Sequence, residues 1–572
     1  MSSAARTWWK EAVVYQIWPR SFQDSNHDGI GDLPGITQRL PYLAQLGINV
    51  IWLCPMFSSP NDDMGYDISD YQGIMDEFGT MEDFDTLVET AHSLGIKILL
   101  DIVVNHTSDE HEWFKQSRSS RENPYRDYYY WRDSSGVDED GNPLPPNNWG
   151  SEFGGRAWEY DEHTDQWYLH IFSKKQPDLN WENEKVREEI YTMINWWLDK
   201  GLDGFRLDAI NIISKPEGLP DDPNIDFDKH GSSIPFVVKN GTKVHQWMHE
   251  LNLKTAANYD VMTVGEMSQT SAEDAVQFAG FDTEELNMIF HFEHMGVDTD
   301  PATGMGKWSI KPYDLVDLKE VLNTWQTTLQ GRAWGSLYWN NHDQPRLISR
   351  FGDDSPQWRV LSGKMLATTL HGMQGTPYIY QGEEFGMTNV QFEEINDYRD
   401  LDSLNLYEDM VVERGNLSHD ACMELIYAKG RDNARTPVQW DASDNAGFSA
   451  VEPWIKLNPN YQNINAEEAL ADSDSLFYHY QKLIQLRRGE LKDLLVYADF
   501  IPLDVEDAQV YAYERHAQDG SKLLVISNFT DQQLTREYEL LDQGELVLSN
   551  YEDDMRQTLR PYESKMYRIN AS

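Results

Sequence analysis

The sequence predicts a (β/α)8 barrel, because eight short apolar runs alternate along the chain with longer amphipathic stretches. The runs are rich in β-branched residues, and the stretches at 83–94 and 186–198 have apolar residues at helical spacing. Strands that alternate with helices form a parallel sheet, and eight such units close into a barrel. The runs are 13–18, 50–53, 96–104, 202–207, 261–264, 288–292, 336–339 and 378–380.

Two parts of the chain depart from the barrel pattern. Residues 106–176 are rich in Gly, Pro, Asn, Tyr and Trp, and a loop of that length should be a subdomain over the barrel mouth. Beyond about residue 491 the pattern changes to alternating strands, at 509–515, 522–528 and 544–548, which predicts an all-β domain. We expect a barrel in two parts, 1–105 and 177–491, interrupted by an inserted subdomain at 106–176. A C-terminal β-sandwich should follow at 492–572.

The charge of the chain restricts its partners. Its 572 residues carry 47 Lys and Arg against 96 Asp and Glu, a formal net charge of −49. This charge repels nucleic-acid phosphates and anionic lipid. It suits a neutral ligand, although it can equally serve solubility alone.

Cysteine usage and hydropathy indicate the compartment. Cys54 and Cys422 lie far apart in the sequence, so we expect no disulfide framework and a reducing environment. Residues 1–10 lack the apolar core of a signal peptide, and no segment approaches the ~20 apolar residues of a membrane helix. We expect a cytoplasmic protein, monomeric or homodimeric, with no membrane or nucleic-acid partner.

The fourth apolar run ends in a cation and an acid, Arg206 and Asp208. Side chains alternate between the faces of a strand, so these two point the same way. A neighbouring cation lowers the pKa of a carboxyl and orients it, as a catalytic carboxylate requires. Taken alone, the pair could equally be a structural ion pair, because charges are seldom buried unpaired.

Two further runs place an acid at the same end of the barrel, with Glu266 after the fifth and Asp343 after the seventh. The C-terminal ends of barrel strands share one rim, where the chemistry of this fold occurs. Like charges at close range raise the pKa of at least one acid, which separates an ionised nucleophile from a protonated acid. Glycosidic cleavage through a covalent intermediate needs both, with carboxyls ~5–5.5 Å apart.

An oxygen-rich loop follows the first run, at residues 24–32. Its spacing matches the first nine positions of an EF-hand loop, but Gly35 stands where the bidentate Glu would be, so it is not an EF-hand. An Asp-rich turn without metal is the alternative. We favour a divalent ion, Ca²⁺ with Mg²⁺ as the second choice, held by Asp24, Asn26, Asp28, the Ile30 carbonyl and Asp32.

With these motifs in order, the chain resembles glycoside hydrolase family 13, the α-amylase family, over nearly its whole length. The segment Gln176-Pro-Asp-Leu-Asn180 resembles the marker of the oligo-1,6-glucosidase subfamily, and 431–437 and 454–461 point the same way. In that subfamily the oxygen-rich loop holds a structural ion. The motifs that carry the resemblance are Asp101-Ile-Val-Val-Asn105-His106, Gly204-Phe-Arg206-Leu-Asp208, Gly265-Glu266 and Asn341-His342-Asp343.

The resemblance implies a retaining mechanism. Asp208 would be the nucleophile, Glu266 the general acid and then the base, and Asp343 the ligand of the sugar's 2- and 3-hydroxyl groups. It also implies a set of substrate-binding residues, of which Asp63 with Arg431 would close the pocket and make the enzyme exo-acting. The set is Asp63, Tyr66, His106, Phe172, Gln176, Arg206, His342 and Arg431.

Ala209, directly after the nucleophile, bears on the linkage. Family members that favour α-1,6 bonds usually carry Val there, and Ala or Thr resembles the α-1,4-cleaving members. One methylene-scale contact amounts to only ~1–3 kcal/mol, which biases the linkage without fixing it. We therefore expect a retaining exo-α-glucosidase that acts on short oligosaccharides and leans to α-1,4 (maltose-type) bonds, with the α-1,6 (isomaltose-type) specificity of oligo-1,6-glucosidases and dextran glucosidases as the alternative.

Other activities of the resembling group fit less well. Trehalose-6-phosphate hydrolysis would want cations near the leaving group, and 267–280 contains no Lys or Arg. That segment also lacks the Pro-Gly common soon after the acid, and Met64 replaces a common Asn. A sucrose isomerase or transglucosylase is a further alternative, but the isomerases of the group carry an Arg-Leu-Asp-Arg-Asp segment that 397–402 does not match. A non-catalytic scaffold would have lost the acids and gained a membrane helix.

Overall fold

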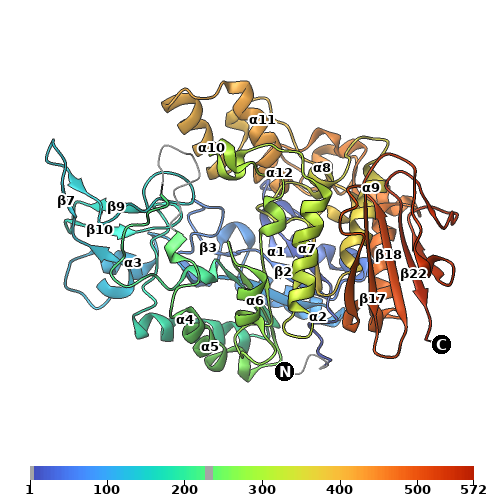
Figure 1. The fold of residues 1–572 in the computed structure, drawn as a ribbon. Coiled ribbons are helices and arrows are strands. Elements are labelled where there is room, and N and C mark those ends of the chain that lie inside the picture. The colour runs from blue at the N-terminus through green and yellow to red at the C-terminus, as the bar shows by residue number, and fades with distance from the viewer. Residues whose placement is uncertain (1–5, 226–235, 572) are drawn as a thin grey trace.

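A sheet of eight parallel strands lies at the centre of the computed structural model, which describes residues 6–225 and 236–571 (Figure 1). The strand order is β13-β12-β11-β5-β2-β1-β15-β14, and Ser336 Oγ donates a hydrogen bond of 2.7 Å to the Ile289 carbonyl, between the two end strands. The predicted (β/α)8 barrel is confirmed. Its strands are β1 (Val14–Ile17), β2 (Val50–Leu53), β5 (Lys97–Val103), β11 (Gly204–Asp208), β12 (Met262–Glu266), β13 (Met288–Phe290), β14 (Ser336–Leu337) and β15 (Thr376–Tyr380).

Helices alternate with these strands as predicted. Helix α2 begins two residues before the expected stretch 83–94, because Thr80 and Asp83 form a reciprocal capping box at its start. Helix α4 begins where the Asn183 side chain accepts a hydrogen bond from the Lys185 amide. The helices of the barrel are α1 (Leu33–Leu46), α2 (Met81–Ser93), α4 (Glu184–Asp199), α5 (Val244–Lys254), α6 (Ala272–Ala279), α7 (Leu315–Leu329), α8 (Leu347–Phe351), α9 (Arg359–His371) and α14 (Leu476–Arg488).

An inserted subdomain follows β5, as predicted, and projects to one side of the barrel (Figure 1). Trp149, Trp158 and Leu169 are buried in an apolar cluster of their own. Hydrogen bonds from the Thr107 and Leu179 amides to the Pro177 and Asn105 carbonyls hold the two ends of the insertion together. Its elements are α3 (Glu112–Arg118), the antiparallel strands β6 (Trp131–Arg132), β9 (Trp158–Asp161) and β10 (Gln166–Leu169), and the pair β7 (Gly136–Val137) and β8 (Pro143–Leu144).

Helices after β15 form a second excursion that the sequence analysis did not predict. Val390, Leu406, Cys422 and Ile426 pack in a separate apolar cluster beneath it. The helices are α10 (Leu401–Tyr407), α11 (His419–Lys429), α12 (Asp432–Arg435) and α13 (Ala466–Ala471), and α10 and α11 lie beside the barrel mouth (Figure 1). A short strand pair, β3 (Phe57–Ser58) and β4 (Asp70–Ile74), follows β2.

The C-terminal domain is all-β, as predicted. Three of its strands match the expected runs within one residue, and β16, β19, β21 and β22 were not predicted. Lys319 of α7 is buried, and its Nζ donates hydrogen bonds of 2.6, 2.8 and 3.0 Å to the carbonyls of residues 504, 507 and 510. The strands are β16 (Asp499–Leu503), β17 (Val510–His516), β18 (Lys522–Asn528), β20 (Glu545–Ser549) and β22 (Ser564–Ile569) in one sheet, with β19 (Leu534–Thr535) and β21 (Thr558–Leu559) paired separately.

Two further predictions concern the cysteines and membrane-spanning segments. Cys54 and Cys422 are both free and buried. Within 6–225 and 236–571, no helix is long and apolar enough to cross a bilayer. Residues 1–5 of the segment examined for a signal peptide lie outside the described residues. The predicted domain boundaries stay predictions.

Candidate active site

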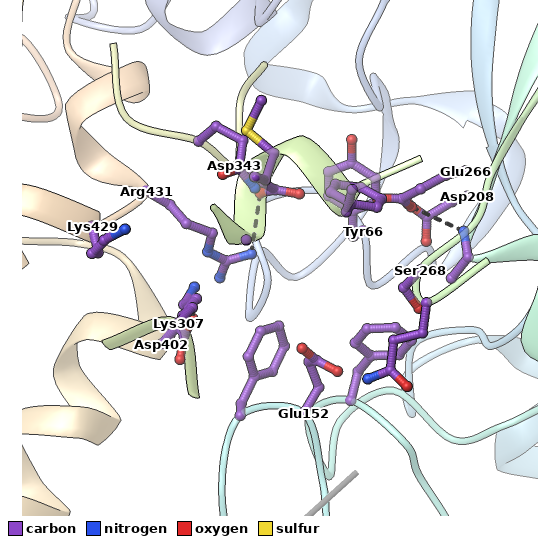
Figure 2. A pocket seen from close by; sticks show the side chains of 18 of the residues that line it. Tyr66, Glu152, Asp208, Glu266, Ser268, Lys307, Asp343, Asp402, Lys429 and Arg431 are labelled. Carbon is purple, nitrogen blue, oxygen red and sulfur yellow. Dashed lines mark hydrogen bonds and ion pairs between the residues drawn. The ribbon is translucent and has the colours of Figure 1, made fainter. Parts of the chain in front are cut away.

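A cavity of about 630 Å³ opens at the C-terminal ends of the barrel strands (Figure 2). Asp208 and Glu266 are the last residues of β11 and β12, and Asp343 follows β14. Three of the predicted residues, Gln176, Arg206 and His342, lie behind the wall and contact residues that line it. The predicted residues that line the cavity are Asp63, Tyr66, His106, Phe172, Asp208, Glu266, Asp343 and Arg431.

Arg206 contacts carboxylates from three strands, and its side chain is 1% exposed. Its Nη1 lies 2.5 Å from Asp208 Oδ1 and 2.9 Å from Asp101 Oδ1, and its Nη2 lies 2.8 Å from Glu266 Oε2. The register of the sheet causes this arrangement, because it sets Arg206 of β11 opposite Asp101 of β5. Asp208 and Glu266 therefore lie at one end of the barrel and contact the same guanidinium.

The two carboxyls beside Arg206 differ in their pKa values. Burial raises the pKa of Glu266 to about 7, since the negative charges of Asp208 and Asp343 add to the effect and Arg206 only partly opposes it. Burial raises the pKa of Asp208 less, to about 6, against the opposing charge of Arg206. Between these values Asp208 is ionised while Glu266 keeps its proton, the division that an attacking group and a proton donor need.

Asp343 is held in its ionised form by cations at the opposite wall. Its Oδ1 lies 2.8 Å from Arg435 Nη2 and 3.4 Å from Arg431 Nη1, and His342 Nε2 lies 3.2 Å from Oδ2. Burial alone would raise the pKa of Asp343, but these three neighbours hold it well below its usual value. Burial lowers the pKa of His342 itself, which favours the neutral imidazole. We therefore assign the stabilisation of the Asp343 charge to the two arginines and to a hydrogen bond with the imidazole.

Tyr66 presents a fixed aromatic face to the cavity. Its ring stacks on His342 with centroids 5.2 Å apart and planes 9° apart, and its hydroxyl donates to Asp101 Oδ2 over 2.9 Å. The side chain of Gln16 approaches the other imidazole nitrogen, Nδ1, at 2.8 Å. A face held in this way can stack against an apolar sugar face.

The inner end of the cavity is closed by an ion pair. Arg431 Nη2 lies 3.2 Å from Asp63 Oδ1, and Gln176 Nε2 donates to Asp63 Oδ2 over 3.2 Å. Asp400 holds Arg431 from behind, accepting a hydrogen bond of 2.7 Å from its Nε. Phe172 packs against His106 with ring centroids 5.0 Å apart. These contacts place a layer of paired side chains across this end of the cavity.

Comparisons with known proteins agree with this architecture. Residues 16–497 match the catalytic domain of α-amylases, and residues 500–555 match their C-terminal all-β domain. The chain belongs to the α-amylase family of glycoside hydrolases.

Three bacterial proteins are similar to this chain over nearly its whole length. It is 53% identical to an oligo-1,6-glucosidase of Parageobacillus thermoglucosidasius over 99% of both chains. It is 52% identical to an α-glucosidase of Pediococcus pentosaceus over 99% of this chain and 100% of the relative. The crystal structure of the trehalose-6-phosphate hydrolase (TreA) of Bacillus licheniformis, 45% identical, matches with a TM-score of 0.90 over 98% of this chain and 100% of that one.

Ala209 lines the cavity and has unusual backbone geometry. Its φ is 43°, in the left-handed region, and its amide donates to Glu266 Oε2 over 3.0 Å. A β-branched residue is strained at such a φ. Substitutions here therefore change the backbone as well as the pocket wall.

Several site residues were missed by sequence reasoning. Asp101 and Arg435 lie inside motifs quoted above, and both side chains are buried. A charged residue within such a motif was the signal that could have identified them. Asp400 and Glu152 come from the second excursion and the inserted subdomain, where no strand or helix periodicity marks a position. Segment 267–280 contributes Ser268 and Gln269 to the cavity.

The carboxylates of the predicted calcium loop accept hydrogen bonds from the loop itself and from neighbouring residues. Asp24 accepts hydrogen bonds from the Gly29 amide and from Ser449 Oγ (2.9 and 2.5 Å). Asp32 Oδ1 accepts from the Gly35 amide over 2.6 Å and caps helix α1. Oxygen donors suit Ca²⁺ or Mg²⁺, but the described residues include no group of three or more His, Cys, Asp or Glu side chains placed to hold a metal ion. The site at Asp24, Asn26, Asp28, Ile30 and Asp32 stays a prediction.

Proposed function

We propose that this chain is a retaining, exo-acting α-glucosidase that removes terminal α-1,6-linked glucose from short oligosaccharides. The observation that carries the proposal is the contact of Asp208 and Glu266 with one guanidinium, Arg206, at the mouth of the barrel. The ion pair of Asp63 and Arg431 supports exo action, since it lies across the inner end of the cavity, where an oligosaccharide would otherwise continue past the reacting sugar.

In the proposed first step, Asp208 attacks the anomeric carbon and the glycosidic bond breaks. Glu266 donates its proton to the leaving oxygen, so the aglycone departs as a neutral alcohol and a β-glucosyl ester remains on Asp208. In the second step Glu266, now a carboxylate, takes a proton from water. The resulting hydroxide attacks the same carbon, releases Asp208 and gives α-glucose.

The remaining residues bind the sugar in this proposal. Asp343, ionised beside Arg435, accepts hydrogen bonds from two ring hydroxyls, and these bonds strengthen as the oxocarbenium ion develops. Tyr66 stacks beneath the ring. Because both groups are fixed by buried partners, little reorganisation accompanies the reaction.

The linkage preference is revised from the maltose-type expectation, which the comparisons do not support. The relative named oligo-1,6-glucosidase at 53% identity favours the α-1,6 alternative. Ala209, with the smaller side chain, favours α-1,4 and keeps that preference as the second candidate. Hydrolysis of a neutral short oligosaccharide is common to both.

The test is kcat/KM for isomaltose, maltose and sucrose at one enzyme concentration, together with proton NMR of the sugar first released. We expect isomaltose to be preferred and α-glucose to appear before its mutarotation. Asp208→Asn should lose at least about a thousandfold of kcat, and Asp140→Asn, in an exposed turn of the inserted subdomain, should match the wild type. First release of β-glucose, or full activity of Asp208→Asn, would overturn the proposal.

A further inference from the structure

Within the described part of the chain, one carboxylate that lines the cavity makes no hydrogen bond or ion pair, that of Glu152 in the inserted subdomain. Figure 2 shows its carboxylate pointing into the cavity from the wall opposite Tyr66 and Asp343. The side chain is exposed, and among the described residues it makes no side-chain hydrogen bond or ion pair. The mechanism above does not use it.

Hydrogen bonds anchor the backbone around Glu152, so its Cα is placed in the cavity wall. The Glu152 amide donates to the Ile171 carbonyl over 2.7 Å, and Ser151 Oγ donates to the Phe172 carbonyl over 2.7 Å. Phe153 is buried beneath Arg431, and its carbonyl accepts a hydrogen bond of 2.9 Å from Asn405. Both neighbours of Glu152 are thus fixed in the wall while its own side chain reaches the solvent of the cavity.

Each of three cations near the entrance contacts a carboxylate, and two of these cations share one carboxylate. Lys307 forms an ion pair with Asp402. Asp298 Oδ2 lies 2.6 Å from Lys429 Nζ, and its Oδ1 lies 2.8 Å from Arg350 Nη2. All three cations line the cavity. A phosphate entering the pocket would therefore compete with Asp402 and Asp298 for these cations, and it would meet the carboxylate of Glu152.

Glu152 lies on the side of the cavity where the aglycone must sit. The residues that close the inner end are buried, at 5% exposure for Asp63 and Tyr66 and 1% for His106. The departing sugar therefore extends toward the entrance, where Glu152 is exposed. The walls exclude much of the surrounding water, which raises the pKa of Glu152, while Lys239, which does not line the cavity, opposes that rise.

We propose that Glu152 is a specificity-determining residue for the aglycone: its carboxylate accepts hydrogen bonds from the hydroxyl groups of a neutral sugar and repels an aglycone that carries a phosphate. This inference rests on the proposed α-glucosidase activity, because it assigns the entrance of the same pocket. It names the substrate class as neutral, non-phosphorylated α-glucosides.

The test compares kcat/KM for isomaltose with kcat/KM for α,α-trehalose 6-phosphate, in the wild type and in Glu152→Gln. The glutamine keeps the shape and removes the charge. We expect the wild type to prefer isomaltose, and Glu152→Gln to shift the ratio toward the phosphorylated disaccharide by about fivefold, the size of a single partly screened charge interaction. Raising the ionic strength should improve the wild-type rate on the phosphorylated sugar, and less so in the variant, because salt screens the repulsion.

Glu162→Gln is the matched control, since Glu162 is an exposed glutamate of the same subdomain that does not line the cavity. It should leave the ratio and its salt dependence at the wild-type values. An unchanged ratio in Glu152→Gln, or a wild type that hydrolyses both sugars equally well, would overturn the inference while leaving the glucosidase intact. Absence of glucose release from isomaltose, maltose and 4-nitrophenyl α-D-glucoside would instead count against the proposed function.

Discussion

Arg206 and burial together set the charge of the two reacting carboxyls. Each is removed from water, which favours the neutral form, and each contacts one nitrogen of the guanidinium, which favours the charged form. The balance leaves the pKa of Glu266 at about 7 and that of Asp208 at about 6. Arg206 lowers both pKa values, and the negative charge of Asp343 adds to the rise at Glu266, so the neighbouring acids take opposite protonation states near neutral pH.

The pH profile of kcat/KM should consequently be a narrow bell. Activity falls below about pH 6 as Asp208 gains a proton and can no longer attack, and it falls above about pH 7 as Glu266 loses the proton it must donate. Because Asp208 and Glu266 interact, the two apparent pKa values of the profile belong to the pair and not to either residue alone. With 4-nitrophenyl α-D-glucoside, whose leaving group needs no proton, Glu266→Ala should lose the alkaline limb; its persistence would mean that another group donates the proton.

Ala209 offers a separate test of the linkage preference. Ala209→Val adds two methyl groups beside the reacting carbon, and we expect the ratio of isomaltose to maltose hydrolysis to rise about tenfold. The ratio is the proper readout, because strain at φ 43° lowers both rates. Ala209→Thr carries the same branching and similar volume, so it controls for strain. Equal ratios in all three proteins would show that this position does not select the linkage.

The turn after β15 holds two buried acids that respond to pH. Burial raises the pKa of Glu383 to about 8 and that of Glu384 to about 7, whereas an unfolded glutamate titrates near ~4.3. The folded protein thus binds more protons than the unfolded chain between these values, so stability falls as the pH rises through them. Tyr480 donates a hydrogen bond of 2.5 Å to Glu383 and keeps the side chain in place.

Thermal unfolding should report this dependence. We expect the apparent Tm to fall between pH 6 and pH 9, and Glu383→Gln, which removes the group that titrates near pH 8, to flatten the decline. Glu467→Gln, an exposed residue of α13, should follow the wild-type curve. A Glu383→Gln curve parallel to the wild type would indicate that this buried carboxyl does not control the dependence.

The oxygen-rich loop links parts of the barrel that are distant in sequence. Asp24 and Gly29 are joined to residues 448–454 through Ser449 Oγ and through the Trp454 amide, which donates 3.0 Å to the Gly29 carbonyl. If the predicted ion occupies this loop, mass action makes it stabilise the folded molecule. Dialysis against EDTA should lower the apparent Tm, Ca²⁺ should restore it, and Asp28→Ala should remove the response; an identical Tm with and without EDTA would contradict the metal site.

The barrel could be predicted because the same burial pattern recurs in each of its strands. Strands buried on both faces read as short apolar runs, so all eight barrel strands were found, and their common direction placed Asp208, Glu266 and Asp343 at one rim. The limits were set by contacts without local periodicity. Asp400 reaches Arg431 from a loop, and Glu152 depends on how the inserted subdomain folds back over the barrel.

Two of the C-terminal strands that were missed, β16 and β22, have a related cause. β22 pairs with β18 and β20 only through long-range register, and β16 is half exposed, so neither has a strong pattern of its own. The contact between the C-terminal domain and the barrel could not be predicted either. In the sequence Lys319 of α7 resembles an ordinary surface cation, whereas in the structure its Nζ donates to three carbonyls. Helices α10 and α11 were missed for want of a clear apolar face.

The assignment of Asp208 as the attacking group is tested most directly by trapping the covalent intermediate. Glu266→Gln, incubated with 5-fluoro-α-D-glucosyl fluoride, can form the glucosyl ester without an acid but lacks the base that would hydrolyse it. Peptide mass spectrometry should then find the fluoroglucosyl adduct on the peptide that contains Asp208. An adduct on Asp343 or on residue 266, or release of fluoride without any protein adduct, would contradict the mechanism.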